Sequence, residues 1–119
     1  MSREAKIAIA YGLIIISISS IPGRNFPDIN LWTKDKLSHL IEFMIFAVLV
    51  HRALGIEFNH SGYSLALTLF IGACFGGLDE LYQSLIPGRD SSLYDWYADS
   101  IGVALGAIAA LVLEKRNAD

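Results

Sequence analysis

Ionisable and amide side chains recur at three places in this chain where long apolar stretches begin or end. They lie in DKLSHLIEF (residues 35–43), DELYQ (residues 79–83) and YDWYADS (residues 94–100). An ionisable group inside a membrane-spanning helix costs at least ~2.5–3.5 kcal/mol, so such groups usually mark a site or a paired network. The candidates from the three stretches are Asp35, Lys36, His39, Glu42, Asp79, Glu80, Gln83, Asp95 and Asp99, and Arg89 lies between the second and third stretches.

The residue types in these stretches suit acid–base chemistry. Asp35, His39 and Glu42 follow the i, i+4, i+7 spacing of one helical face. Histidine exchanges a proton near neutral pH, and carboxylates that crowd together have a raised pKa. Arg89 can bind an anion through two parallel hydrogen bonds. These are the parts needed for general acid–base work on an anionic or carbonyl substrate. A purely structural role, as polar contacts between packed helices, remains open for each residue taken singly.

Four apolar blocks must position these groups, at about 5–21, 37–54, 63–81 and 96–113. The chain has 119 residues, of which 54% are hydrophobic and 18% charged, and its mean hydropathy is +0.48. Each block is long enough to cross a ~30 Å hydrocarbon core as a helix, near the lower limit. A soluble four-helix bundle would need a polar face on every helix, which IAIAYGLIIISIS and IGVALGAIAALVL lack. The first block resembles a secretory signal peptide, but we interpret it as a first span.

The sequence therefore predicts an all-α, polytopic membrane protein with four transmembrane helices arranged as two helical hairpins in one domain, 1–119. The tetrapeptide Ile-Pro-Gly-Arg closes two of the blocks, at 21–24 and 86–89. Proline cannot continue a helix, and glycine takes the turn conformations that follow it. With four spans, both copies and all three polar stretches fall on the same side of the membrane. We therefore expect residues up to 60 positions apart to form one interfacial layer.

The distribution of Lys and Arg weakly favours an orientation with both termini in the cytoplasm. The two ends and the loop near residue 55 carry five of these residues, and the two loops with Ile-Pro-Gly-Arg carry four. If Lys36 and Arg89 belong to a site and are left out of the count, the two loops with Ile-Pro-Gly-Arg carry two of these residues. We therefore expect a bacterial cytoplasmic membrane location with both termini inside. No basic stripe indicates a nucleic-acid partner.

Several other motifs bear on packing and chemistry. GACFG (residues 72–76) and GVALG (residues 102–106) are both G-x-x-x-G, so these helices could approach closely, with each other or across a homo-oligomer. The single cysteine, Cys74, excludes an intramolecular disulfide. His39 with several carboxylates could form a metal site, but no H-E-x-x-H or paired-cysteine spacing is present, so we predict no metal site and identify no cofactor.

The motifs together resemble the VanZ-like family of small membrane proteins, which is associated with teicoplanin resistance. The resemblance covers about residues 35–106 and rests on DKLSHLIEF, DELYQSLIPGRDSSLYD and GVALG. It implies a polytopic envelope protein that lowers glycopeptide susceptibility, and it implies no particular reaction. It places the family's polar motif on Asp35, Lys36, His39, Asp79, Glu80, Gln83, Arg89 and Asp95. Where relatives usually carry asparagine, this chain has Asp99.

Two functions stay open at this point. In the first, the protein is an enzyme acting on a lipid-linked envelope precursor, with His39 and Glu80 as base and acid and Asp79 and Asp95 orienting them. The substrate would then be bound by Asp35, Lys36, Gln83, Arg89 and Asp99. In the second, the protein binds membrane lipid or a glycopeptide, or is structural, and the polar residues form a packing network.

Overall fold

The computed structural model describes residues 1–20, 32–57, 62–88 and 93–118, and only the backbone of 32–35, 57, 62 and 117–118. Within these ranges the chain is all-α, as predicted. It forms α1 (Arg3–Ser19), α2 (Trp32–Glu57), α3 (Gly62–Gln83) and α4 (Leu93–Ala118). The helices α2 and α4 extend beyond the predicted 37–54 and 96–113, because the polar residues before each apolar block are themselves helical.

Local sequence signals define several helix ends. Ser2 caps α1 by accepting a hydrogen bond from the Ala5 amide at 3.1 Å. Helix α4 has Asp95 in its first turn and Lys115 and Arg116 in its last, which complements the helix dipole. After α3 ends, Gly88 in the second Ile-Pro-Gly-Arg adopts φ 77°, a left-handed conformation that favours glycine. The first copy of this motif lies outside the described residues.

Three stretches are long and apolar enough to cross a membrane, within the part of the chain that the structure describes. They are Lys36–Ile56, Tyr63–Gln83 and Leu93–Arg116. Many large apolar side chains on their outer faces are exposed, among them Phe70 and Ile108. Such surfaces suit a lipid environment, so the chain is an integral membrane protein. Helix α1 has 17 residues, which at 1.5 Å per residue extends roughly 26 Å; a fourth span stays a prediction.

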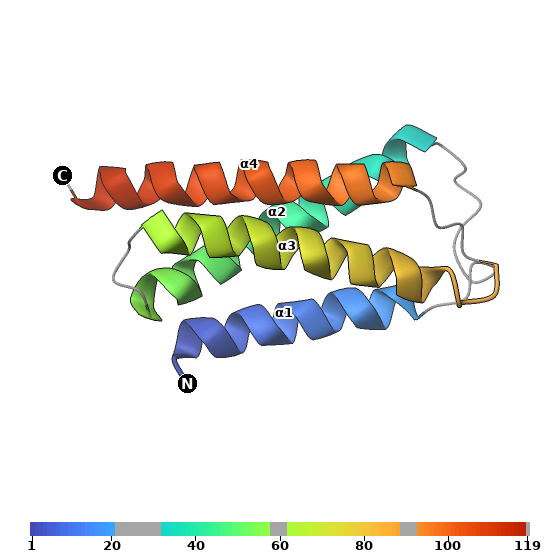
Figure 1. Ribbon diagram of the computed structural model, residues 1–119, viewed down its shortest axis with the longest axis horizontal. Helices are drawn as coiled ribbons and strands as arrows, with labels where there is room; N and C mark the ends of the chain where they lie inside the picture. The colour runs from blue at the N-terminus through green and yellow to red at the C-terminus, as the bar shows by residue number, and fades with distance from the viewer. Residues whose placement is uncertain (21–31, 58–61, 89–92, 119) are drawn as a thin grey trace.

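The four helices lie side by side, and each runs opposite to the one before it (Figure 1). The most extensive packing joins α2 to α4, which are not consecutive in the sequence. Gly102 and Gly106 make this possible, because a Cβ at either position would collide with the carbonyl oxygen of Leu40 or Met44 on α2. The G-x-x-x-G of α4 therefore serves contact with α2. The predicted grouping into two hairpins stays a prediction.

Aromatic rings fill the space between α2 and α3. Phe43 is fully buried, and Phe46 stacks on Phe75 with 4.8 Å between ring centroids. Phe43 also lies 5.9 Å from Phe75 between centroids. Because Phe43 follows His39 by one helical turn, this apolar core begins directly beside the polar residues of α2.

Candidate functional site

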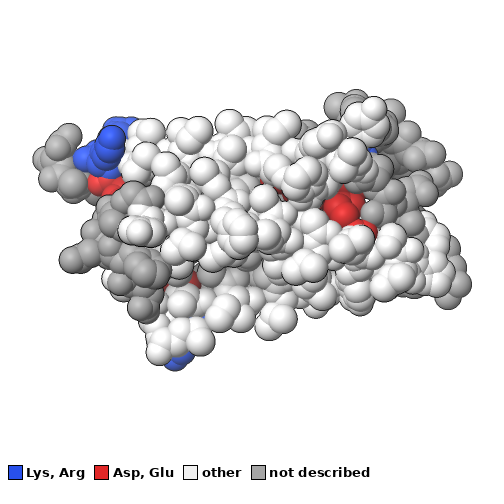
Figure 2. Space-filling model, in the orientation of Figure 1, with Lys and Arg blue, Asp and Glu red and all other residues white. Residues whose placement is uncertain are grey.

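The predicted polar residues gather at the end of the bundle where α1 and α3 finish and α2 and α4 begin (Figure 1). In the space-filling view, acidic atoms are visible at this end, and the middle of the same face carries almost no charge (Figure 2). The buried polar side chains here are Ser19, His39, Asp79, Glu80, Gln83, Asp95 and Asp99. We call the seven residues, with Lys36, the polar layer.

The centre of the polar layer is a contact between three helices. Nδ1 of His39 on α2 lies 2.9 Å from Oδ1 of Asp99 on α4, within hydrogen-bond distance. The same nitrogen lies 3.4 Å from Oε1 of Glu80 on α3. Asp99 is 0% exposed, and His39 and Glu80 are 5% and 7% exposed. The three side chains therefore form one buried acid–imidazole cluster, which we call the His39 cluster.

Close helix packing brings these side chains together. Gly76 on α3 faces Asp99, and a Cβ there would lie 3.0 Å from the Cβ of Asp99 and 3.5 Å from the ring of Phe43. The absence of a side chain at this position allows α3 to approach α4 one turn from Glu80. The indole Nε1 of Trp96 also donates to the carbonyl of Ala73 at 3.0 Å and so links the same two helices.

A second part of the polar layer is an ion pair between α2 and α4. The Nζ of Lys36 bonds to Oδ1 of Asp95, with side chains 16% and 2% exposed. Asp95 and Asp99 are four residues apart on α4, so one face of this helix contacts Lys36 and His39 in succession. The partly buried Lys36 therefore gives the buried Asp95 carboxylate an oppositely charged partner.

The third part is a hydrogen-bonded network between α1 and α3. The Ser19 hydroxyl donates to Oδ1 of Asp79 at 2.5 Å, and Nε2 of Gln83 donates to Ser19 at 3.1 Å. The same Gln83 nitrogen lies 3.2 Å from Oδ2 of Asp79. All three side chains are at most 2% exposed. These bonds fix the end of α1 against α3.

The His39 cluster has the composition needed for two kinds of chemistry. An imidazole between two carboxylates can pass a proton to or from a bound group. One atom each from His39, Glu80 and Asp99 lie within 4.8 Å of one another, so the same residues could hold a metal ion. In both cases these three side chains are the reactive part of the polar layer.

Most of the predicted site residues meet in this layer, in three separate groups. Lys36, His39, Asp79, Glu80, Gln83, Asp95 and Asp99 are all brought to one end of the bundle. The Asp35 side chain and Arg89 lie outside the described residues. Whether the assembled residues are catalytic or substrate-binding stays a prediction.

Sequence reasoning did not select Ser19 or the pair formed by His51 and Glu114. Ser19 ends an apolar helix at the level of the other polar residues, which is the signal that could have identified it. His51 is 3% exposed, and its Nε2 lies 3.2 Å from Oε2 of Glu114. This pair is at the opposite end of α2 and α4 from the polar layer, and twelve residues separate His51 from His39.

Comparison with protein families gives one match that spans nearly the whole chain. The family model described as VanZ/LLP1 matches residues 5–114. The matched region contains every residue of the polar layer. Searches of curated proteins and of solved structures gave no match.

Proposed function

The chain belongs to the VanZ/LLP1 family, and we propose that it acts on an anionic, lipid-linked precursor of the bacterial envelope and thereby lowers teicoplanin susceptibility. The observation that supports this most is the His39 cluster. Two carboxylates and an imidazole from three helices meet at the end of a bundle whose outer surface is apolar. A membrane protein rarely places so many ionisable groups together without a function for them.

The proposal gives each part of the polar layer a role. His39 and Glu80 exchange a proton with the substrate, and Asp99 orients the imidazole through its 2.9 Å contact with Nδ1. Lys36 binds an anionic group of the substrate, which must compete with Asp95 for the ammonium. In this proposal Arg89 supplies a second cation for the same anion. Asp79 and Gln83, bonded to Ser19, hold α1 in place beside the site.

The test is a comparison of two matched substitutions in cells and in detergent. Glu80→Gln keeps the shape of the side chain and removes its charge and proton exchange. Glu114→Gln makes the same change beside the other buried histidine, His51. We expect teicoplanin susceptibility of cells with Glu80→Gln to equal that of cells lacking the protein, while Glu114→Gln still protects. No protection by the wild type would contradict the proposed function.

One observation favours a structural alternative. The network of Ser19, Asp79 and Gln83 is buried and internally hydrogen-bonded, which is what polar contacts between packed membrane helices require. In that case the whole polar layer stabilises the bundle. Glu80→Gln would then lower the melting temperature together with protection, or change neither.

A further inference from the structure

We propose that His39, Glu80 and Asp99 bind a divalent transition-metal ion of the zinc type. The inference rests on the function proposed above in that it places an ion at the same site. With the ion bound, His39 and Glu80 act as its ligands rather than by direct proton exchange with the substrate, and the test measures binding directly. Three different helices each supply one ligand atom, and these atoms lie within 4.8 Å of one another. The ion would join α2, α3 and α4 at a single point.

The distances between the ligand atoms suit such an ion. Nitrogen and oxygen ligands lie roughly 2.0–2.2 Å from zinc, so neighbouring ligand atoms around the ion are roughly 3–3.5 Å apart. The His39 Nδ1 atom lies 2.9 Å from Asp99 Oδ1 and 3.4 Å from Glu80 Oε1. Two of the three distances between ligand atoms therefore lie close to those around a bound zinc ion. The ion takes the place of the proton between His39 and Asp99.

Charge balance is a second argument. Glu80 and Asp99 are 7% and 0% exposed, and each carboxyl group adds a buried negative charge when it is ionised. Isolated buried charges are expensive, and buried charges in proteins are usually paired or coordinated to metals. A divalent cation balances both carboxylates and leaves His39 as a neutral ligand. With a neutral asparagine in place of Asp99, Glu80 alone would offer a negative charge to the ion, which is half the charge of the two carboxylates.

A spare acceptor atom is a third, independent observation. Oδ2 of Asp99 is inaccessible and has no hydrogen-bond partner among the described residues. A buried acceptor without a partner is unfavourable, and coordination of the ion through both Oδ1 and Oδ2 would relieve it.

The ligand types indicate which ion binds. Calcium and magnesium take all-oxygen sites, whereas imidazole together with carboxylates suits zinc and neighbouring transition metals. Three protein ligands leave a coordination position for water or a substrate oxygen, as in catalytic zinc sites. The site would therefore present a polarising cation next to the anion-binding Lys36.

Zinc binding to the full-length protein tests the inference. The protein is purified in detergent, treated with a chelator and titrated with Zn²⁺ by calorimetry. We expect one zinc per chain. We expect Asp99→Asn to weaken zinc binding by more than about 100-fold. Substitutions of residues that only contact the ligands usually weaken metal binding by about 10–100-fold. His51→Gln alters the other buried histidine and should leave the affinity unchanged.

Two results would overturn the inference. One is a wild type that binds no zinc stoichiometrically. The other is Asp99→Asn protein that binds zinc with the affinity of the wild type. If Asp99→Asn does not fold, X-ray absorption at the zinc edge of the wild type decides: imidazole with carboxylate oxygens supports the site, and sulfur or a second imidazole overturns it. Zinc binding without teicoplanin protection would contradict the proposed function and leave this inference standing.

Discussion

At the scale of residues, the polar layer is built from three groups of contacts. Lys36 pairs with Asp95, His39 contacts Asp99 and Glu80, and Ser19 bonds with Asp79 and Gln83. The types and helical spacing of these residues are visible in the sequence, so most members could be predicted. Their partners could not, because pairing depends on how each helix is rotated about its axis.

Ser19→Ala tests the contact that sequence reasoning missed. The change removes the donor to Asp79 and leaves a buried carboxylate oxygen without that bond. We expect a loss of about 1–3 kcal/mol in the free energy of unfolding, measured by denaturation in detergent. Ser17→Ala is the matched control, because the exposed Ser17 hydroxyl donates to the Leu13 carbonyl within its own helix. Equal effects of the two changes would contradict the assigned role.

At the scale of elements, glycines determine how closely the helices approach. Gly102 and Gly106 place α4 against the backbone of α2, and Gly76 places α3 against Asp99. The sequence shows the G-x-x-x-G patterns and predicts close packing, but it does not say which helix each pattern contacts. Which helix each pattern contacts depends on the apolar faces of all four helices, since α4 packs against both α2 and α3.

Gly102→Ala tests this packing. Alanine favours a helix by about 1 kcal/mol over glycine, yet its Cβ would collide with the Leu40 carbonyl. We expect a net destabilisation of about 1–3 kcal/mol, typical of overpacking, with a lower melting temperature in detergent. The control is Gly77→Ala, where the new Cβ would lie 3.4 Å from Trp96 Nε1 and the fold should hold or gain stability. A Gly102→Ala protein as stable as the wild type would show that α2 and α4 are further apart.

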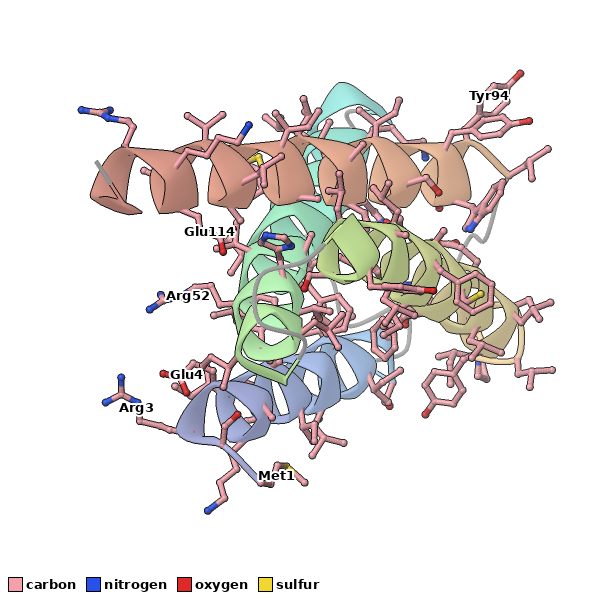
Figure 3. The ribbon with its side chains drawn as sticks, turned by 60° about the vertical axis from the view of Figure 1, so that its left-hand side comes forward. Met1, Arg3, Glu4, Arg52, Tyr94 and Glu114 are labelled. Atoms are coloured by element: carbon pink, nitrogen blue, oxygen red, sulfur yellow. The ribbon has the colours of Figure 1, made fainter. Side chains whose placement is uncertain are left out.

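At the scale of the whole molecule, the two ends of the bundle differ in chemistry. Arg3, Glu4, Arg52 and Glu114 lie at the end where α1 begins and α4 finishes, and Tyr94 lies at the other end (Figure 3). The first end holds basic residues near the surface, and the second holds the buried polar layer. The alternation of helix direction explains why the sequence could predict this convergence. The precise ends of the helices were less predictable, because polar residues such as Lys36 are helical although they precede the apolar block.

Cys74 offers a test of membrane embedding. It is exposed near the middle of α3, inside the span Tyr63–Gln83, so in a membrane its thiol should face lipid. A membrane-impermeant maleimide should therefore leave Cys74 unlabelled in open membrane fragments and label it after denaturation. Arg3→Cys in a Cys74→Ser background is the control, since Arg3 lies at the end of the bundle. Rapid labelling of Cys74 in membranes would contradict the membrane arrangement.

The measurement that tests the central claim most directly pairs teicoplanin susceptibility with melting temperature for the Glu80→Gln protein. The account predicts full loss of protection, while the melting temperature of the chelator-treated protein changes by less than about 4 °C, which corresponds to less than roughly 1 kcal/mol. Glu114→Gln should keep both properties. Loss of protection in proportion to a fall in melting temperature, or full protection by Glu80→Gln, would contradict the claim that the His39 cluster is a functional site.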